Sequence, residues 1–141
     1  MKPIADEMVL DCMGGWMRMA SRIVTAIYDE ALSDLGLKGS QLNLLVVVFR
    51  EGTIRQTDLA TLFNIDETTL SRNVMRMCRK GWLAPQPSKD RRSHGITVTE
   101  RGRHMIERAY PAWKAAQTEI LRRLGTEGAA ALKDTLRQLL V

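Results

Sequence analysis

Apolar residues recur at helical spacing along most of the chain, and glycines and short polar segments separate the helices that they predict. The first apolar stripe covers residues 7–33 and predicts one long helix. Ser40 is a good N-cap for a second helix over residues 41–50, which is apolar on nearly every side and is therefore expected to be buried on most of them. Gly52 ends this helix, and a short extended segment follows over residues 53–55.

Two short helices joined by a tight turn come next. The spacing predicts helices over residues 56–63 and 67–80. The turn between them contains Asn64, which tolerates unusual backbone angles, and Ile65, which we expect to point inward. Asp66 supplies an N-cap for the second helix. The residues expected to form the buried stripe of the first helix are Leu59, Ala60, Leu62 and Phe63.

A hairpin and a longer helix follow these two short helices. Strand-like residues 82–84 and 95–98 flank a polar, turn-rich loop, and this arrangement predicts a β-hairpin with an extended tip. Thr99 then caps a helix over residues 100–124, in which Pro111 is expected to introduce a kink or a break.

Positive charge is concentrated in one part of the chain. The protein has 141 residues and a net charge of +5. Residues 67–103 contain nine Lys or Arg and three acidic residues, a net charge of +6, whereas the rest of the chain contains 12 basic and 13 acidic residues, a net charge of −1. A local positive field beside two helices joined by a tight turn is typical of proteins that bind duplex DNA.

The second short helix has the division expected of a recognition helix. At 100° per residue, its apolar residues fall on one side, and its polar and basic residues fall on the other. Arg72 is best placed to contact a guanine edge, whereas Arg76 and Arg79 are expected to contact phosphates. A solvated cationic face is the alternative explanation, and the tight turn and the adjoining basic hairpin argue against it. The residues of this helix expected to contact DNA are Thr68, Thr69, Ser71, Arg72, Arg76 and Arg79.

The tip of the hairpin carries a second cluster of basic residues. A narrow minor groove has an enhanced negative potential that attracts an inserted arginine. Asp90 lies among these basic residues, where a bidentate pair with an arginine would hold the guanidinium in a fixed direction. An exposed loop with an incidental ion pair is the alternative. The wing residues expected to contact DNA are Lys89, Asp90, Arg91, Arg92 and His94.

Two stretches of the sequence, QTDLATLFNIDETTLSRNVMRMCRKGWL and DRRSHGITVTERG, resemble the MarR family of winged helix-turn-helix transcriptional regulators. The D-R-R tip followed by T-E-R-G is the most specific part. The resemblance implies a mainly α fold (an α+β winged helix-turn-helix) with about six helices and a β-hairpin wing. It also implies that Asp90 and Arg92 orient one another at the minor groove. Arg55, in place of a Thr or Ser cap, and Pro85, in place of a basic residue, depart from the family pattern.

The same resemblance implies how such a protein is regulated. We expect a repressor of near-palindromic DNA operators that a small-molecule effector releases. The effector would bind in a crevice between the dimer helices and the winged module. No cofactor is expected.

The terminal helices carry more apolar surface than one small winged module can cover. A second copy of the chain in a two-fold interface is therefore the expected partner. We assign residues 1–39 and 100–141 to dimerisation and residues 40–99 to the DNA-binding module. The two parts are expected to form one intertwined domain in each chain. The residues expected at the homodimer interface are Met8, Val9, Trp113, Ile120, Leu132, Leu136 and Leu140.

Features of other functional classes are few in this sequence. It contains no phosphate-binding loop, nucleophile elbow or pair of catalytic acids, so we do not expect an enzyme. Its two histidines do not suffice for a His-rich metal site. Two cysteines and the lack of a signal peptide or a long apolar run indicate a cytoplasmic protein. Two alternatives stay open: a peroxide-responsive regulator that senses through Cys12, and a winged-helix module that binds protein rather than DNA.

Overall fold

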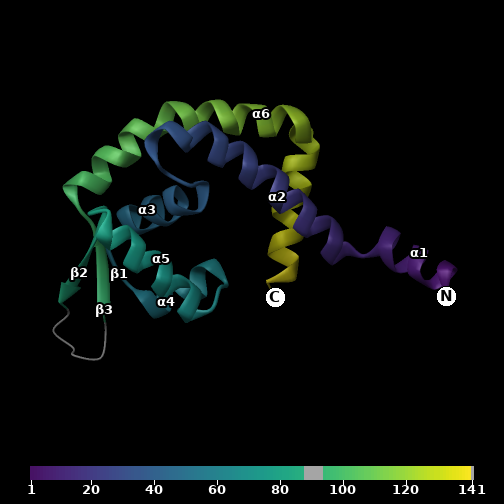
Figure 1. The fold of residues 1–141 in the computed structure, drawn as a ribbon, viewed down its shortest axis with the longest axis horizontal. Helices are drawn as coiled ribbons and strands as arrows, with labels where there is room; N and C mark the ends of the chain where they lie inside the picture. Colours follow the sequence, from purple (N-terminus) through teal and green to yellow (C-terminus); the bar gives the residue numbers. More distant parts are fainter. Residues whose placement is uncertain (88–93, 141) are drawn as a thin grey trace. The chain divides into compact units, whose positions relative to one another are not determined.

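The structure is a computed structural model that describes residues 1–87 and 94–140. Its elements fall into two compact units, one formed by residues 34–111 and the other by residues 1–33 together with residues 112–141. The winged unit, residues 34–111, contains α3 (Gly39–Glu51), β1 (Thr53–Arg55), α4 (Gln56–Phe63), α5 (Glu67–Arg79), β2 (Leu83–Pro87), β3 (His94–Val98) and the first part of α6 (Glu100–Leu139) (Figure 1). The terminal unit contains α1 (Lys2–Asp11), α2 (Met13–Leu32) and the second part of α6, and a 3₁₀ turn (Ser33–Leu35) follows α2.

Three short antiparallel strands form the sheet of the winged unit, in the order β1-β3-β2. Ile96 in the central strand pairs with Ile54 on one side and with Pro85 on the other. β2 is longer than the strand predicted over residues 82–84, because it continues through Pro85 and Pro87. Proline has no N–H to donate, but a strand at the edge of a sheet pairs on one side only, so both prolines are accommodated.

Apolar side chains from α3, α4, α5 and the strands form the core of the winged unit. Leu62 and Ile65 were expected to be buried, and this expectation is wrong, because they are 55% and 39% exposed. Leu62 lies about 160° around α4 from the buried Ala60, so this short helix cannot bury both. α3 is also less covered than predicted, since Val46 and Phe49 are exposed. The buried core residues of the unit include Leu42, Leu45, Val48, Leu59, Leu70, Val74, Met77, Trp82, Leu83 and Ile96.

The N-terminal segment forms two helices instead of the single helix predicted over residues 7–33. The break lies at Cys12, whose backbone is extended with a ψ of 99°. The Cys12 sulfur accepts a hydrogen bond from the backbone N–H of Gly15 (3.4 Å) and thereby caps α2. Gly14 and Gly15 favour such a break because glycine is a weak helix former. α1 contains no buried residue.

α6 does not break at Pro111, contrary to the prediction. The φ angle of proline is itself helical, so the residue removes one hydrogen bond without ending the helix. The non-helical residue is Gly125, with φ 73° and ψ 164°, where the sequence predicted a helix end. In the terminal unit, the Tyr28 hydroxyl donates a hydrogen bond to the Gln117 side-chain carbonyl and ties α2 to α6. Over the described residues, no helix combines the length and hydropathy that a membrane span requires.

Candidate nucleic-acid interface

Asp66 and Gly81 fix the two ends of α5. One oxygen of the Asp66 carboxylate accepts a hydrogen bond from the Thr69 backbone N–H (2.9 Å), and the other accepts one from the Thr69 hydroxyl (2.6 Å). The first bond satisfies a backbone donor that the helix itself cannot pair. Gly81 adopts a φ of 76°, which residues with a side chain rarely adopt, just beyond the end of the helix. Both predicted helix ends are confirmed.

Asp66→Ala is expected to lower the Tm by roughly 2–5 °C at neutral pH, because the first turn of α5 loses both hydrogen bonds. The bonds from the Thr69 hydroxyl and N–H hold the pKa of the Asp66 carboxyl below its ordinary value. A carboxyl whose pKa is lowered by folding stabilises the protein above its ordinary pKa, and this stabilisation is lost as the pH falls. The Tm difference between wild type and variant should therefore shrink below about pH 4.

Thermal unfolding at a series of pH values measures this difference. Asp66→Asn is the matched control, because it keeps an acceptor oxygen without a charge that titrates, and its Tm should lie closer to that of the wild type. A Tm difference for Asp66→Ala that stays constant from about pH 7 to about pH 3 would contradict the role given to the carboxylate.

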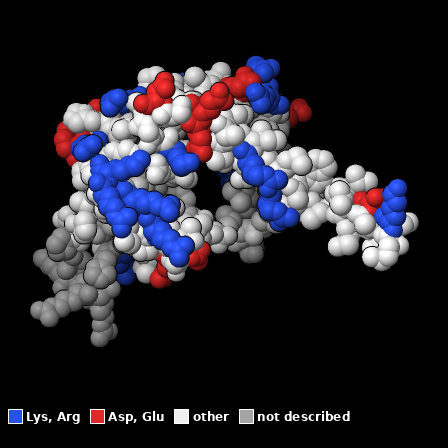
Figure 2. Space-filling model, in the orientation of Figure 1, with Lys and Arg blue, Asp and Glu red and all other residues white. Residues whose placement is uncertain are grey.

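α5 has one buried side and one exposed side, as its sequence pattern predicted. Leu70, Val74 and Met77 are at most 2% exposed. Figure 2 shows Lys and Arg side chains gathered over this helix. Within residues 1–87 and 94–140, none of the ion pairs involves Arg72 or Arg76. The exposed residues on the outer side are Thr68, Thr69, Arg72, Met75, Arg76 and Arg79.

Three polar residues in or beside α5 are partly buried or form contacts within the fold that the sequence did not indicate. The Thr69 hydroxyl donates its proton to Asp66, so it cannot donate the same proton to a phosphate. Ser71 is half-buried. The Lys80 ammonium donates a hydrogen bond to the Gly36 carbonyl (2.9 Å) and lies 4.6 Å from the centre of the Trp82 ring. Arg72, Arg76 and Arg79, which are all exposed, stay the candidate cations of this helix for contact with DNA.

The tip of the wing lies outside the described residues. Lys89, Asp90, Arg91 and Arg92 belong to this segment, and the description likewise does not extend to the side chain of His94. Their contacts with DNA, and the pairing of Asp90 with Arg92, stay predictions. β2 and β3 lead into and out of the tip.

Thr99 joins the last strand to α6 at the base of the wing. Its hydroxyl donates to the Gly81 carbonyl (2.5 Å) and also accepts a hydrogen bond from the backbone N–H of Gly102 (3.0 Å), which confirms the predicted cap. Its own backbone N–H donates to the Trp82 carbonyl (3.0 Å). Through these hydrogen bonds, Thr99 connects the start of α6 to Gly81 and Trp82, which follow α5.

Gly102 positions the base of the wing, a structural role that the sequence pattern did not indicate. A Cβ atom at this position would lie 2.2 Å from the Trp82 carbonyl oxygen and 2.7 Å from Cγ1 of Val98, closer than atoms can approach. A side chain therefore does not fit between α6 and the base of the wing. The T-E-R-G motif marked this glycine, but the contact itself joins residues that are distant in the sequence. Together, Thr99 and Gly102 position the wing strands relative to α5.

The residues predicted at the homodimer interface differ in their exposure. Ile120 is only 6% exposed and Trp113 is half-buried, so both offer little free surface to a second copy. The remaining predicted residues are all more than half exposed: Met8, Val9, Leu132, Leu136 and Leu140.

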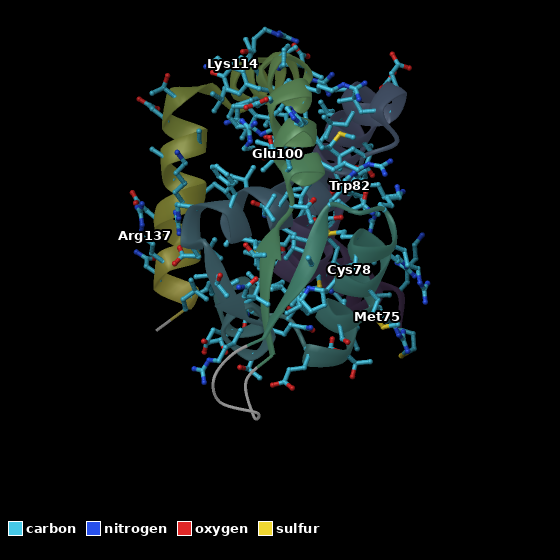
Figure 3. All side chains as sticks on the ribbon, turned by 90° about the vertical axis from the view of Figure 1, so that its left-hand side faces the viewer. Met75, Cys78, Trp82, Glu100, Lys114 and Arg137 are labelled. Atoms are coloured by element: carbon cyan, nitrogen blue, oxygen red, sulfur yellow. The ribbon has the colours of Figure 1, made fainter. Side chains whose placement is uncertain are left out.

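The two cysteines lie in different environments. Cys12 is exposed, whereas Cys78 is half-buried and its burial raises the pKa of the thiol. In Figure 3, Cys78 lies on the side of α5 toward the strands, and Met75 lies on the outer side. In the part of the chain that the structure describes, no three His, Cys, Asp or Glu side chains form a group that could hold a metal ion.

The fold and its basic helix define a winged helix-turn-helix protein, with α4 and α5 joined at the left-handed Asn64 and a hairpin beside them. The model of the MarR family matches residues 35–93 of the chain. Over this segment the chain is similar to the MarR family of transcriptional regulators. The predicted fold class and the predicted resemblance to this family are confirmed.

Known proteins of similar sequence and structure agree with this resemblance. The uncharacterized HTH-type transcriptional regulator YwoH of Bacillus subtilis (strain 168) is 21% identical over 124 residues, which cover 88% of this chain and 90% of the relative. A crystal structure of a mutant MarR from E. coli complexed with operator DNA has a TM-score of 0.85 and 21% identity, over 96% of this chain and 98% of that chain. BpsR of Bordetella bronchiseptica, whose DNA binding is regulated by 6-hydroxynicotinic acid, has a TM-score of 0.79 and 23% identity, over 90% and 91%.

Proposed function

We propose that this protein binds duplex DNA as a homodimer and represses genes whose operators are near-palindromes. The observation that carries the proposal is the outer side of α5, where three arginines are exposed on a helix whose other side is buried in the core. A rigid cationic helix of this kind suits the major groove, where residues near its N-terminus reach base edges. Arg72 would contact a guanine, and Arg76 and Arg79 would contact phosphates.

The wing supplies the second contact in this proposal. Lys89, Asp90, Arg91, Arg92 and His94 would enter or border the adjacent minor groove, with Asp90 orienting the guanidinium of Arg92. In a two-fold dimer, the two α5 helices would meet half-sites about 10 base pairs apart.

Two of the similar proteins support DNA binding and its control by a ligand. The mutant MarR from E. coli is complexed with operator DNA, and the DNA binding of BpsR is regulated by 6-hydroxynicotinic acid. We extend both properties to this chain as proposals: it binds an operator, and a small-molecule effector releases it.

Selection of bound sequences from random duplexes tests the proposal directly. We expect a two-fold motif, and an affinity for the selected duplex that falls by orders of magnitude between low and physiological salt, because several phosphate contacts release counterions. A winged-helix module that binds only protein would select no motif and would show no such salt dependence with DNA.

Leu136→Asp combined with Leu140→Asp is expected to convert the homodimer to monomers and to abolish operator binding. Both leucines are exposed and lie one turn apart, Leu136 in the last turn of α6 and Leu140 just beyond it, and a second copy of the chain would cover them. Light scattering should give the mass of one chain instead of two. Thr135→Asp combined with Gln138→Asp adds the same charge at polar positions of the same helix and should stay dimeric. An unchanged mass for the leucine variant would exclude these residues from the interface.

Sensing of peroxides through Cys12 is the second candidate mode of regulation. The thiol is exposed at the break between α1 and α2, where an oxidant can reach it. A hydroperoxide titration followed by measurement of DNA binding separates the two modes. Sensing through this residue predicts release of DNA by wild type and retention by Cys12→Ser, and identical responses exclude it.

A further inference from the structure

Met75 is the apolar exception on the outer side of α5. Its side chain is 51% exposed and lies on the outer side of the helix (Figure 3). Arg72 lies one turn before it and Arg79 one turn after it, and both are exposed. The core does not need this thioether, because Leu70, Val74 and Met77 already fill the inner side.

The chemistry of Met75 limits what it can contact in the major groove. Arginine and threonine recognise bases and phosphates by donating hydrogen bonds, whereas a thioether donates none and accepts them only weakly. The C5 methyl group of thymine is the apolar group that base pairs present in the major groove. A flexible, unbranched side chain such as methionine adapts its shape to such a group.

The position of Met75 along the helix fixes where that methyl group must lie. Residues three apart in an α-helix are separated by about 4.5 Å along the axis, compared with about 3.4 Å between successive bases. A thymine methyl within reach of Met75 would therefore lie about one or two base pairs from the base that Arg72 contacts.

We propose that Met75 is a specificity-determining residue that contacts the C5 methyl group of one thymine in each operator half-site. This inference rests on the proposed binding of DNA through α5. It adds an apolar contact to a surface that otherwise recognises DNA by charge and hydrogen bonds. Because the contact is uncharged, the loss of Met75 should lower affinity without changing the slope of affinity against salt concentration.

The test replaces each thymine of the selected operator in turn by deoxyuridine, which removes only the methyl group. Wild-type protein should lose roughly three- to tenfold in affinity at one thymine per half-site, the effect of losing one buried methyl contact. Met75→Ala should bind the unmodified operator more weakly by a similar factor and should be insensitive to deoxyuridine at that same thymine. Met75→Leu keeps an apolar side chain and should retain the sensitivity.

The outcomes separate this inference from the proposed function. The role of Met75 is refuted if Met75→Ala keeps the full deoxyuridine sensitivity of wild type at every thymine, or if it binds the operator as tightly as wild type. Neither result contradicts the proposed binding of DNA. If wild-type protein selects no duplex at all, the proposed function fails and the inference fails with it. Unchanged thermal unfolding of Met75→Ala, expected for an exposed residue, excludes misfolding as a cause of weaker binding.

Discussion

Replacing Arg72 and Arg76 together with glutamate is expected to weaken operator binding roughly thirtyfold to more than ten-thousandfold, because one arginine contact with a base or phosphate contributes about 1–3 kcal/mol. Both side chains are exposed on α5, and none of the ion pairs in the described part of the chain includes either one. Their positive charge is therefore available to DNA. Glutamate at these positions would also repel the phosphates, which adds to the loss.

Titration of the selected operator at several salt concentrations measures both the affinity and its salt slope. The slope should fall by about one for each phosphate contact removed. Arg108→Glu combined with Lys114→Glu is the matched control, because it changes the net charge equally at exposed positions of α6. If the control weakens binding as much as the α5 variant, net charge alone explains the effect and α5 is not the recognition helix.

Gly102→Ala is expected to destabilise the protein by about 3 kcal/mol or more, in contrast to the usual effect of replacing a helical glycine by alanine. The added Cβ would lie 2.2 Å from the Trp82 carbonyl oxygen. This oxygen belongs to the backbone and also accepts the hydrogen bond of the Thr99 N–H, so it cannot move aside as a flexible side chain would. Relief of the clash requires the start of α6 to separate from the base of the wing.

Thermal unfolding provides the measurement for this substitution, with an expected fall in Tm of roughly 10 °C or more. Gly128→Ala is the matched control. Among the described residues, a Cβ atom there would lie 3.7 Å from its nearest neighbour, the Cβ of Leu124, which is ordinary van der Waals contact. Because alanine is the better helix former, the control should keep or slightly raise the Tm. Equal Tm values for the two variants would show that the contact between Gly102 and Trp82 does not constrain the fold.

The ends of α5 could be predicted from sequence because they are set by local interactions. Asp66 caps α5 through a residue three positions away, and Asn64 and Gly81 adopt left-handed angles, which asparagine tolerates and which glycine adopts because it has no Cβ. The predicted Ser40 cap of α3, by contrast, is wrong, because the helix begins before this residue, at Gly39. There the Gln41 side chain accepts a hydrogen bond from the Lys38 N–H (3.0 Å). The two sides of α5 were also predictable, because apolar and basic residues alternate with the period of one regular helix. The candidate DNA contacts of Arg72, Arg76 and Arg79 follow from that pattern.

Burial and strand length could not be predicted in the same way. Leu62 and Ile65 are as apolar as Leu59, yet they are exposed because nothing in the described chain packs over them. β2 continues through Pro85 because it is an edge strand, a property that depends on the order of all three strands. The exposure of Met75 becomes informative only once the inner side of α5 is seen to be filled.

The sequence by itself determined the class of fold, the caps of α5 and α6, the turn at Asn64 and the location of the positive charge. Each of these depends on residues that are close along the chain, where backbone angles and helical periodicity act directly. Only the tertiary structure decided that Cys12 divides the first helix, that Lys80 is engaged within the fold, and that Gly102 has no space for a side chain. These outcomes depend on which backbone conformation and which partner are favoured in the assembled fold, and a pattern of residue types does not specify either.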